Sequence, residues 1–198
     1  HEDTGSFLNI FAGPTSSYGH AIWLQHCDNA TVRNNQVGGQ QNGISLFHCT
    51  VATVEYNEAS DNNGWGIQLY NTDNSTVQYN TANDCTRVGY WGNGGDAASL
   101  LMVYGSSNNQ ILHNTLLRGG DGVFLAGATS SLQAQPNNDN YFYGNDCSDS
   151  PNNGFEATFS QRNVFENNVS DRCNYGYWLG YSSASTMRAN QANNCTTA

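Results

Sequence analysis

Two stretches of the sequence, LQHCDNATVRNN at residues 24–35 and LFHCTVATVEYN at residues 46–57, are near copies of each other, 22 residues apart. Both place apolar residues at the same positions, carry a His-Cys pair and end on Asn. Self-similarity at a fixed period is the sequence mark of a repeat architecture. The two stretches therefore decide the fold if further copies follow them.

Further copies run to the end of the chain. Each has the pattern apolar-x-apolar, a third apolar residue ten positions after the first, and an Asn three positions later, and the fifth copy fits once a loop is allowed before its third apolar residue, Phe142. In the fourth copy the pattern places Leu101 and Val103 on the inward side. The steps between the Asn residues are 22, 23, 34, 31, 23 and 22, so the two long steps predict inserted loops near 86–97 and 126–138. The repeated Asn residues are Asn35, Asn57, Asn80, Asn114, Asn145, Asn168 and Asn190.

Apolar residues at every second position indicate strands with one buried face. A repeat of this size cannot bury that face alone, but stacked repeats can. We therefore predict an all-β fold, a parallel β-helix of about seven coils, forming one domain over residues 1–198 with residues 1–17 as an N-terminal half-coil or extension. Stacked Asn amides can satisfy each other and the buried turn backbone, which predicts an asparagine ladder.

Composition narrows the partners. The net charge is −10, and all six basic residues are Arg. Such a chain lacks the clustered cations that nucleic acid or an anionic membrane requires, and no apolar run is long enough to span a bilayer. The first residue is His1, as expected of a processed or excised product. We expect an extracellular, cell-surface or periplasmic location.

The His-Cys pairs allow two interpretations. Cys27 and Cys49 fall in one inward column, and Cys173 and Cys195 in another, so they are stacked small residues or candidate disulfides. A metal-handling site would combine both Cys with His26 and His48. Neighbouring strand residues point to opposite sides, so we expect structural residues and no metal site.

Outward positions on the first strand of each coil are rich in aromatic residues. Such a row is unusual for a solvated face and is typical of a binding surface. The predicted carbohydrate-binding residues are Trp23, Phe47, Tyr70, Tyr104, Phe124 and Trp178. The alternative is that the two inserted loops fold over these rings and bury them.

Acidic residues beside the insertions give a second candidate site. Asp96, Asp121 and Glu156 are expected to meet in one cleft, where carboxylates serve as acid and base or bind calcium. The alternative is that Asp121 caps a turn and Glu156 is solvated. No other cofactor is expected.

The columns G-[IV]-x-L, a small residue, then V-x-x-N resemble the right-handed parallel β-helix proteins of the pectate-lyase-like superfamily and the NosD-type repeat proteins, over residues 18–198. The phrase GGDGVFLAG at 119–127 looks like a superfamily repeat. The resemblance implies a right-handed helix. Family polygalacturonases use Asp-Asp and Gly-His-Gly, epimerases use Asp-Pro-His, and lyases use a Lys or Arg base. The three motifs and Lys are absent here, and no Arg falls in the strand columns that face outward.

These features predict a polysaccharide-associated binding or self-stacking structural module, with a lyase or hydrolase as the alternative and a metal-handling protein as a second one. The missing end caps predict either a fragment or end-to-end contact with other copies. The sequons at Asn29, Asn74 and Asn194 are candidate glycosylation sites, whereas the one at Asn168 falls on the ladder.

Overall fold

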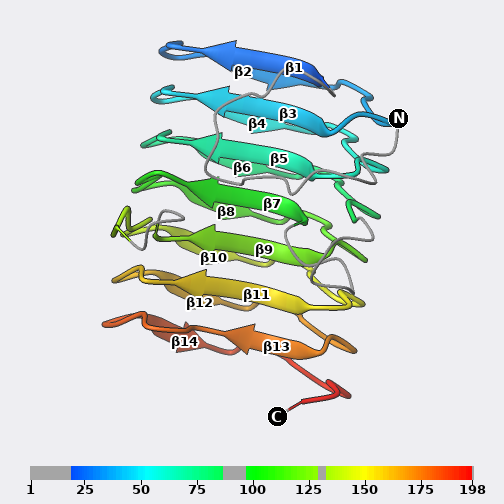
Figure 1. Ribbon diagram of the computed structural model, residues 1–198, viewed down its shortest axis with the longest axis vertical. Coiled ribbons are helices and arrows are strands. Elements are labelled where there is room, and N and C mark those ends of the chain that lie inside the picture. The colour runs from blue at the N-terminus through cyan, green and yellow to red at the C-terminus, as the bar shows by residue number, and fades with distance from the viewer. Residues whose placement is uncertain (1–18, 87–96, 129–132, 198) are drawn as a thin grey trace.

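The computed structural model describes residues 19–86, 97–128 and 133–197, and these residues form two parallel sheets of seven strands each (Figure 1). The first sheet contains β1 (His20–Gln25), β3 (Asn42–Phe47), β5 (Trp65–Tyr70), β7 (Ala98–Val103), β9 (Asp121–Ala126), β11 (Asn153–Thr158) and β13 (Tyr175–Trp178). The second contains β2 (Thr31–Arg33), β4 (Thr53–Glu55), β6 (Thr76–Gln78), β8 (Gln110–Leu112), β10 (Tyr141–Tyr143), β12 (Val164–Glu166) and β14 (Thr186–Arg188).

Each strand pairs in parallel with its equivalent one coil later, and so the spatial order of each sheet follows the sequence. The coils are stacked like rungs (Figure 1). This is the predicted right-handed parallel β-helix. The N-terminal residues 1–17 and most of the first insertion lie outside the described residues.

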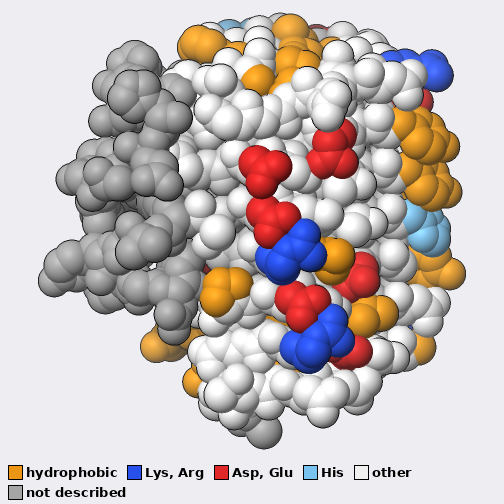
Figure 2. Space-filling view, turned by 90° about the vertical axis from the view of Figure 1, so that its right-hand side faces the viewer, with side chains coloured by type: hydrophobic (Ala, Val, Ile, Leu, Met, Phe, Trp, Pro, Cys, Tyr) orange, Lys and Arg blue, Asp and Glu red, His pale blue; other side chains and the backbone are white. Residues whose placement is uncertain are grey.

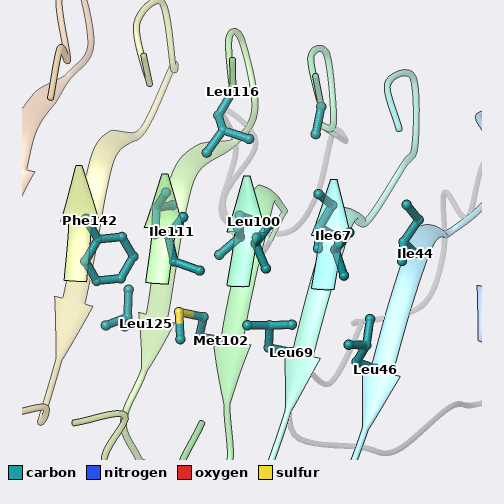
Figure 3. Packing of buried hydrophobic residues seen from close by; sticks show 14 of the residues in the cluster. Ile44, Leu46, Ile67, Leu69, Leu100, Met102, Ile111, Leu116, Leu125 and Phe142 are labelled. Atoms are coloured by element: carbon teal, nitrogen blue, oxygen red, sulfur yellow. The ribbon is translucent and has the colours of Figure 1, made fainter. Parts of the chain in front are cut away.

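The core runs between the two sheets. Side chains of equivalent residues on successive coils contact one another along it, such as Ile44, Ile67 and Leu100 (Figure 3). These side chains are fully buried. The stacking gives each coil the apolar cover that it cannot provide for itself.

Asn side chains form a continuous line of hydrogen bonds along one turn. The amide Nδ2 of each ladder residue donates to Oδ1 of the next, at 2.9–3.1 Å, from Asn35 to Asn190. The backbone N–H of each also donates to that same oxygen. A shorter second ladder joins Asn109, Asn140 and Asn163, each five residues before a ladder Asn. This second ladder was not predicted, although the constant spacing of five residues before a ladder Asn is present in the sequence.

The fourth coil departs from the predicted register by one residue. Leu100 and Met102, and not Leu101 and Val103, align with Ile67 and Leu69 and join the core. All five residues from Ser99 to Val103 are buried, so alternation gave no signal there. Gly105, at φ +82°, supplies the extra residue that restores the frame before Asn114.

Tight turns are marked by residues in the left-handed region. One such column includes Asn29, Val51 and Asn74, at φ 56°, 55° and 53°. Asn adopts this conformation readily, whereas a β-branched residue is strained in it. Val51 is therefore a strained position in an exposed turn.

Glycines before the inward residues have a packing reason. A Cβ built on Gly122 would lie 2.5 Å from Cys147 Cβ and 2.6 Å from the Gly154 carbonyl oxygen. Only a residue without a side chain fits there.

Within the described ranges, the chain has no helix with the length and apolar character needed to cross a bilayer.

Candidate functional site

An aromatic cluster occupies the outer face of the first sheet over the first four coils. Its seven rings belong to His20, Trp23, His26, Phe47, His48, Tyr70 and Tyr104. The Phe47 and Tyr70 ring centroids are 4.7 Å apart, and those of Tyr70 and Tyr104 are 4.4 Å apart, both stacked. The parallel register places these rings one coil above another, so their contacts follow directly from the fold.

The cluster is open at one end and closed in the middle. Trp23 is 48% exposed, with its ring stacked on His20 and nearly perpendicular to that of Phe47. Phe47 is only 3% exposed, and Tyr70 and Tyr104 are half-buried. Burial, with a smaller effect of Tyr104, raises the pKa of Tyr70 to about 12. Trp23 is therefore the ring best placed to meet a ligand.

Uncharged polar side chains lie beside these rings. Asn42 Nδ2 donates to Gln68 Oε1 at 3.2 Å, and Ser45 Oγ donates to the same oxygen at 3.2 Å. His20 Nδ1 is 2.8 Å from Ser45 Oγ and 3.1 Å from Asn42 Nδ2. Burial lowers the pKa of His20, so its ring is neutral near pH 7. Two polar atoms of this face, Asn42 Oδ1 and Trp65 Nε1, have no hydrogen-bond partner.

Beside the aromatic cluster, on β5, β7 and β9, the outer face is apolar and buried. Trp65, Ala98, Leu101, Val103, Phe124 and Ala126 form a separate cluster, against which Tyr70 and Tyr104 pack. Phe124 is 9% exposed, so this predicted binding residue has little open surface. Residues 87–96 and 129–132 of the two insertions lie outside the described residues. The alternative that the insertions fold over this face therefore stays a prediction.

The remaining aromatic residue of the predicted row is distant from the others. Trp178 is on β13, in the last coil, and is 42% exposed. Its ring lies over Gly180, with a ring carbon 3.0 Å from where a Cβ would stand. Four of the six predicted rings thus come together, at Trp23, Phe47, Tyr70 and Tyr104.

Two of the three predicted acidic residues share a buried network. Asn153 Nδ2 donates to Asp121 Oδ1 at 3.0 Å and to Glu156 Oε2 at 2.6 Å. Asp121 Oδ1 also accepts from Asn152 Nδ2 and from the Asn153 backbone N–H. Asp121 is 1% exposed and Glu156 is 8% exposed, so neither carboxyl group is a solvated surface group. The third residue, Asp96, lies outside the described residues.

The His-Cys pairs divide between surface and core. His26 and His48 are exposed and stacked at 5.0 Å, whereas Cys49 is buried in the core and Cys27 packs against it. Within the described ranges no three His, Cys, Asp or Glu residues are placed to hold a metal ion. No disulfide joins any of the six cysteines in this structure. Formation of the Cys27–Cys49 and Cys173–Cys195 bonds under oxidising conditions stays a prediction. Burial raises the pKa of Cys173 to about 11.

A second line of rings escaped the sequence analysis. Tyr56, Tyr79 and His113 each precede a ladder Asn, and they stack face to face at 5.2 and 5.3 Å. The signal in the sequence was a ring-bearing residue directly before three successive ladder Asn residues. Because the faces are covered by one another, this line presents mainly ring edges to solvent.

Acidic and basic side chains gather on the turns that precede the first-sheet strands, the side shown in Figure 2. Arg118 forms a bidentate ion pair with Asp84, and Arg172 forms one with Asp149. Each pair joins residues of successive coils. Next to the first pair is a cleft of about 290 Å³ whose lining includes Asp61 and Asp84. Opposite charges in register avoid the repulsion that a column of Asp would create.

The candidate glycosylation sites differ in access. Asn29, Asn74 and Asn194 are exposed at left-handed turn positions, whereas Asn168 is fully buried in the ladder. Modification of the three exposed residues stays a prediction.

Comparison with known proteins identifies the fold family. The model of the right-handed beta helix region matches residues 11–138, well over half of the chain. No curated protein matches the sequence. Among solved structures, the mannuronan C-5 epimerase A-module of Azotobacter vinelandii is 14% identical, with a TM-score of 0.50 over 83% of this chain and 58% of that one.

An alginate lyase from Paenibacillus sp. str. FPU-7 is 11% identical, with a TM-score of 0.48 over 84% of this chain and 67% of that one. The chain thus spans little more than half of the epimerase module. Both neighbours are named as polysaccharide-acting enzymes, and identities this low show a common fold alone. The matched model and the stacked parallel sheets agree, and the chain belongs to the right-handed β-helix family.

Proposed function

We propose that the chain is an extracellular polysaccharide-binding β-helix that holds its ligand at the aromatic cluster. The observation that carries the proposal is the continuous contact of seven rings, which ends in the half-exposed Trp23. Tyr and Trp offer large rigid surfaces that pack on the C–H face of a sugar ring, with a polar atom for its hydroxyl groups.

The polar surroundings support a sugar ligand. Binding sites combine apolar and aromatic walls with a few placed polar groups. The exposed Gln25 and the half-buried His20 and Tyr70 provide such groups on this face. Asn42, Ser45 and Gln68 are at most 1% exposed and bond to one another behind them. The name of one structural neighbour, a mannuronan epimerase, fits a carbohydrate ligand on this fold.

The proposal is tested by native electrophoresis through gels that contain a soluble polysaccharide. The panel consists of xylan, glucomannan, hydroxyethylcellulose, pectin and alginate. We expect at least one polymer to retard the chain, and Trp23→Ala to remove the retardation. Tyr56→Ala is the matched control, because Tyr56 is equally exposed at 52% but belongs to the other line of rings. Loss of binding in the control alone, or no retardation at all, contradicts the proposal.

One observation favours a second candidate function, a carbohydrate-active enzyme. The Asp121 and Glu156 carboxyl groups contact one amide nitrogen, so their oxygens are no further apart than two hydrogen bonds end to end. Closely spaced carboxyl groups are the catalytic pair of retaining glycosidases.

Release of reducing ends from the polymers of the panel measures this activity. We expect Asp121→Asn with Glu156→Gln to abolish any activity of the native chain while retardation through Trp23 persists. Activity that survives both substitutions removes this candidate. End-to-end stacking of copies and calcium binding stay predictions.

A further inference from the structure

The outer face of the first four coils carries aromatic and uncharged polar side chains. Its outward positions on β1, β3, β5 and β7 hold no Asp, Glu, Arg or Lys among the described residues. The basic groups here are imidazoles, and burial keeps His20 neutral near pH 7. A charged ligand would therefore find few opposite charges on this face.

The arginines are placed elsewhere. Four of the six, Arg118, Arg162, Arg172 and Arg188, form ion pairs with carboxylates on turns or on the second sheet. Arg33 lies on β2 of the second sheet, and Arg87 lies outside the described residues. With a net charge of −10, the molecule as a whole repels a polyanion.

We propose that the ligand of the aromatic cluster is a neutral glycan, recognised through its ring faces and hydroxyl groups, and not an acidic polysaccharide. This inference rests on the proposed binding function and names its ligand class. It departs from what the fold neighbours suggest, since alginate and mannuronan are polyanions.

The test uses pairs of polymers that share a backbone and differ in charge. Hydroxyethylcellulose is paired with carboxymethylcellulose, and highly methyl-esterified pectin is paired with the same pectin after de-esterification. We expect the neutral member of a pair to retard the chain, in a way that Trp23→Ala removes, about tenfold more strongly than its anionic partner. Because the difference arises from charge, it should narrow as salt is added.

The outcomes separate this inference from the function on which it rests. Retardation that depends on Trp23 but is equal or stronger with the anionic member overturns the neutral-glycan inference and leaves the binding function standing. A difference within the pair that salt does not reduce also overturns it. The absence of any Trp23-dependent retardation overturns both. Far-UV circular dichroism of Trp23→Ala checks its fold, and Tyr104→Ala provides a second variant of the aromatic cluster.

Discussion

The sharpest stability prediction concerns Asn114, in the middle of the asparagine ladder. Its Nδ2 donates to the Val77 carbonyl and to Asn145 Oδ1, at 2.9 and 3.0 Å. Its Oδ1 accepts from the backbone N–H and the side-chain Nδ2 of Asn80, at 2.9 and 3.0 Å. The residue is 1% exposed, so water cannot replace these partners.

Asn114→Ala leaves one buried group without any partner, the Asn80 N–H, because the Val77 carbonyl also accepts a ladder hydrogen bond from β8, with which Val77 is paired. The other two partners keep a bond, because Asn80 Nδ2 still reaches backbone carbonyls and Asn145 Oδ1 still accepts from the backbone N–H of residue 114. An orphaned buried group costs about 1–3 kcal/mol, so we expect a loss of about 2 kcal/mol in the free energy of unfolding.

The matched control is Asn35→Ala at the end of the same ladder. Asn35 donates to Asn57 Oδ1 and to the Arg33 carbonyl, and it is partly exposed. Water can solvate what is left, so the expected cost is about 1 kcal/mol or less. Urea unfolding followed by far-UV circular dichroism measures both variants. Equal losses in the two variants would refute the reasoning that buried amide pairing holds the coils together.

Three further predictions follow from local geometry. Val51→Asn should raise the free energy of unfolding by about 1 kcal/mol, because Asn adopts the left-handed turn that strains Val, and a change in the urea midpoint checks it. Gly122→Ala should cost about 3 kcal/mol by the same measurement, because its Cβ would overlap Cys147 Cβ at 2.5 Å. Burial raises the pKa of the Cys85 thiol from 9.0 to about 12 and that of Tyr70 from 10.0 to about 12. These groups are protonated in the fold, so the melting temperature should be unaffected by them below pH 9 and should fall as the pH rises toward 12, and a melting temperature that holds steady through pH 12 would contradict this.

The fold was predictable because each buried core position recurs in successive repeats of the sequence. The ladder and the strand registers of most coils follow from that repetition. The fourth coil was misplaced because SLLMV is apolar throughout: Leu101 and Val103 belong to the outer apolar cluster, while Leu100 and Met102 belong to the core. Periodicity cannot choose a register where both faces are buried.

The candidate site was predictable only in part. The aligned positions of the repeats predicted that Trp23, Phe47 and Tyr70 lie on one face, and the structure brings these rings into contact. Tyr104 joins them from a left-handed turn position and not from a strand, since the shift in register moves it past the end of β7. Phe124 is buried in a cluster with apolar neighbours on the same face of the sheet, among them Leu101 and Ala126, and the shifted register of the fourth coil hid this cluster from the repeat pattern.

The most direct test of the central claim is an NMR titration of the ¹⁵N-labelled chain with cellohexaose, xylohexaose and mannohexaose in turn. The indole N–H resonances report each tryptophan separately. We predict that one neutral hexasaccharide shifts the Trp23 resonance in a saturable way and leaves that of Trp178, in the last coil, unchanged. A shift confined to Trp178, or none at Trp23 with any of the three sugars, would contradict binding at the aromatic cluster.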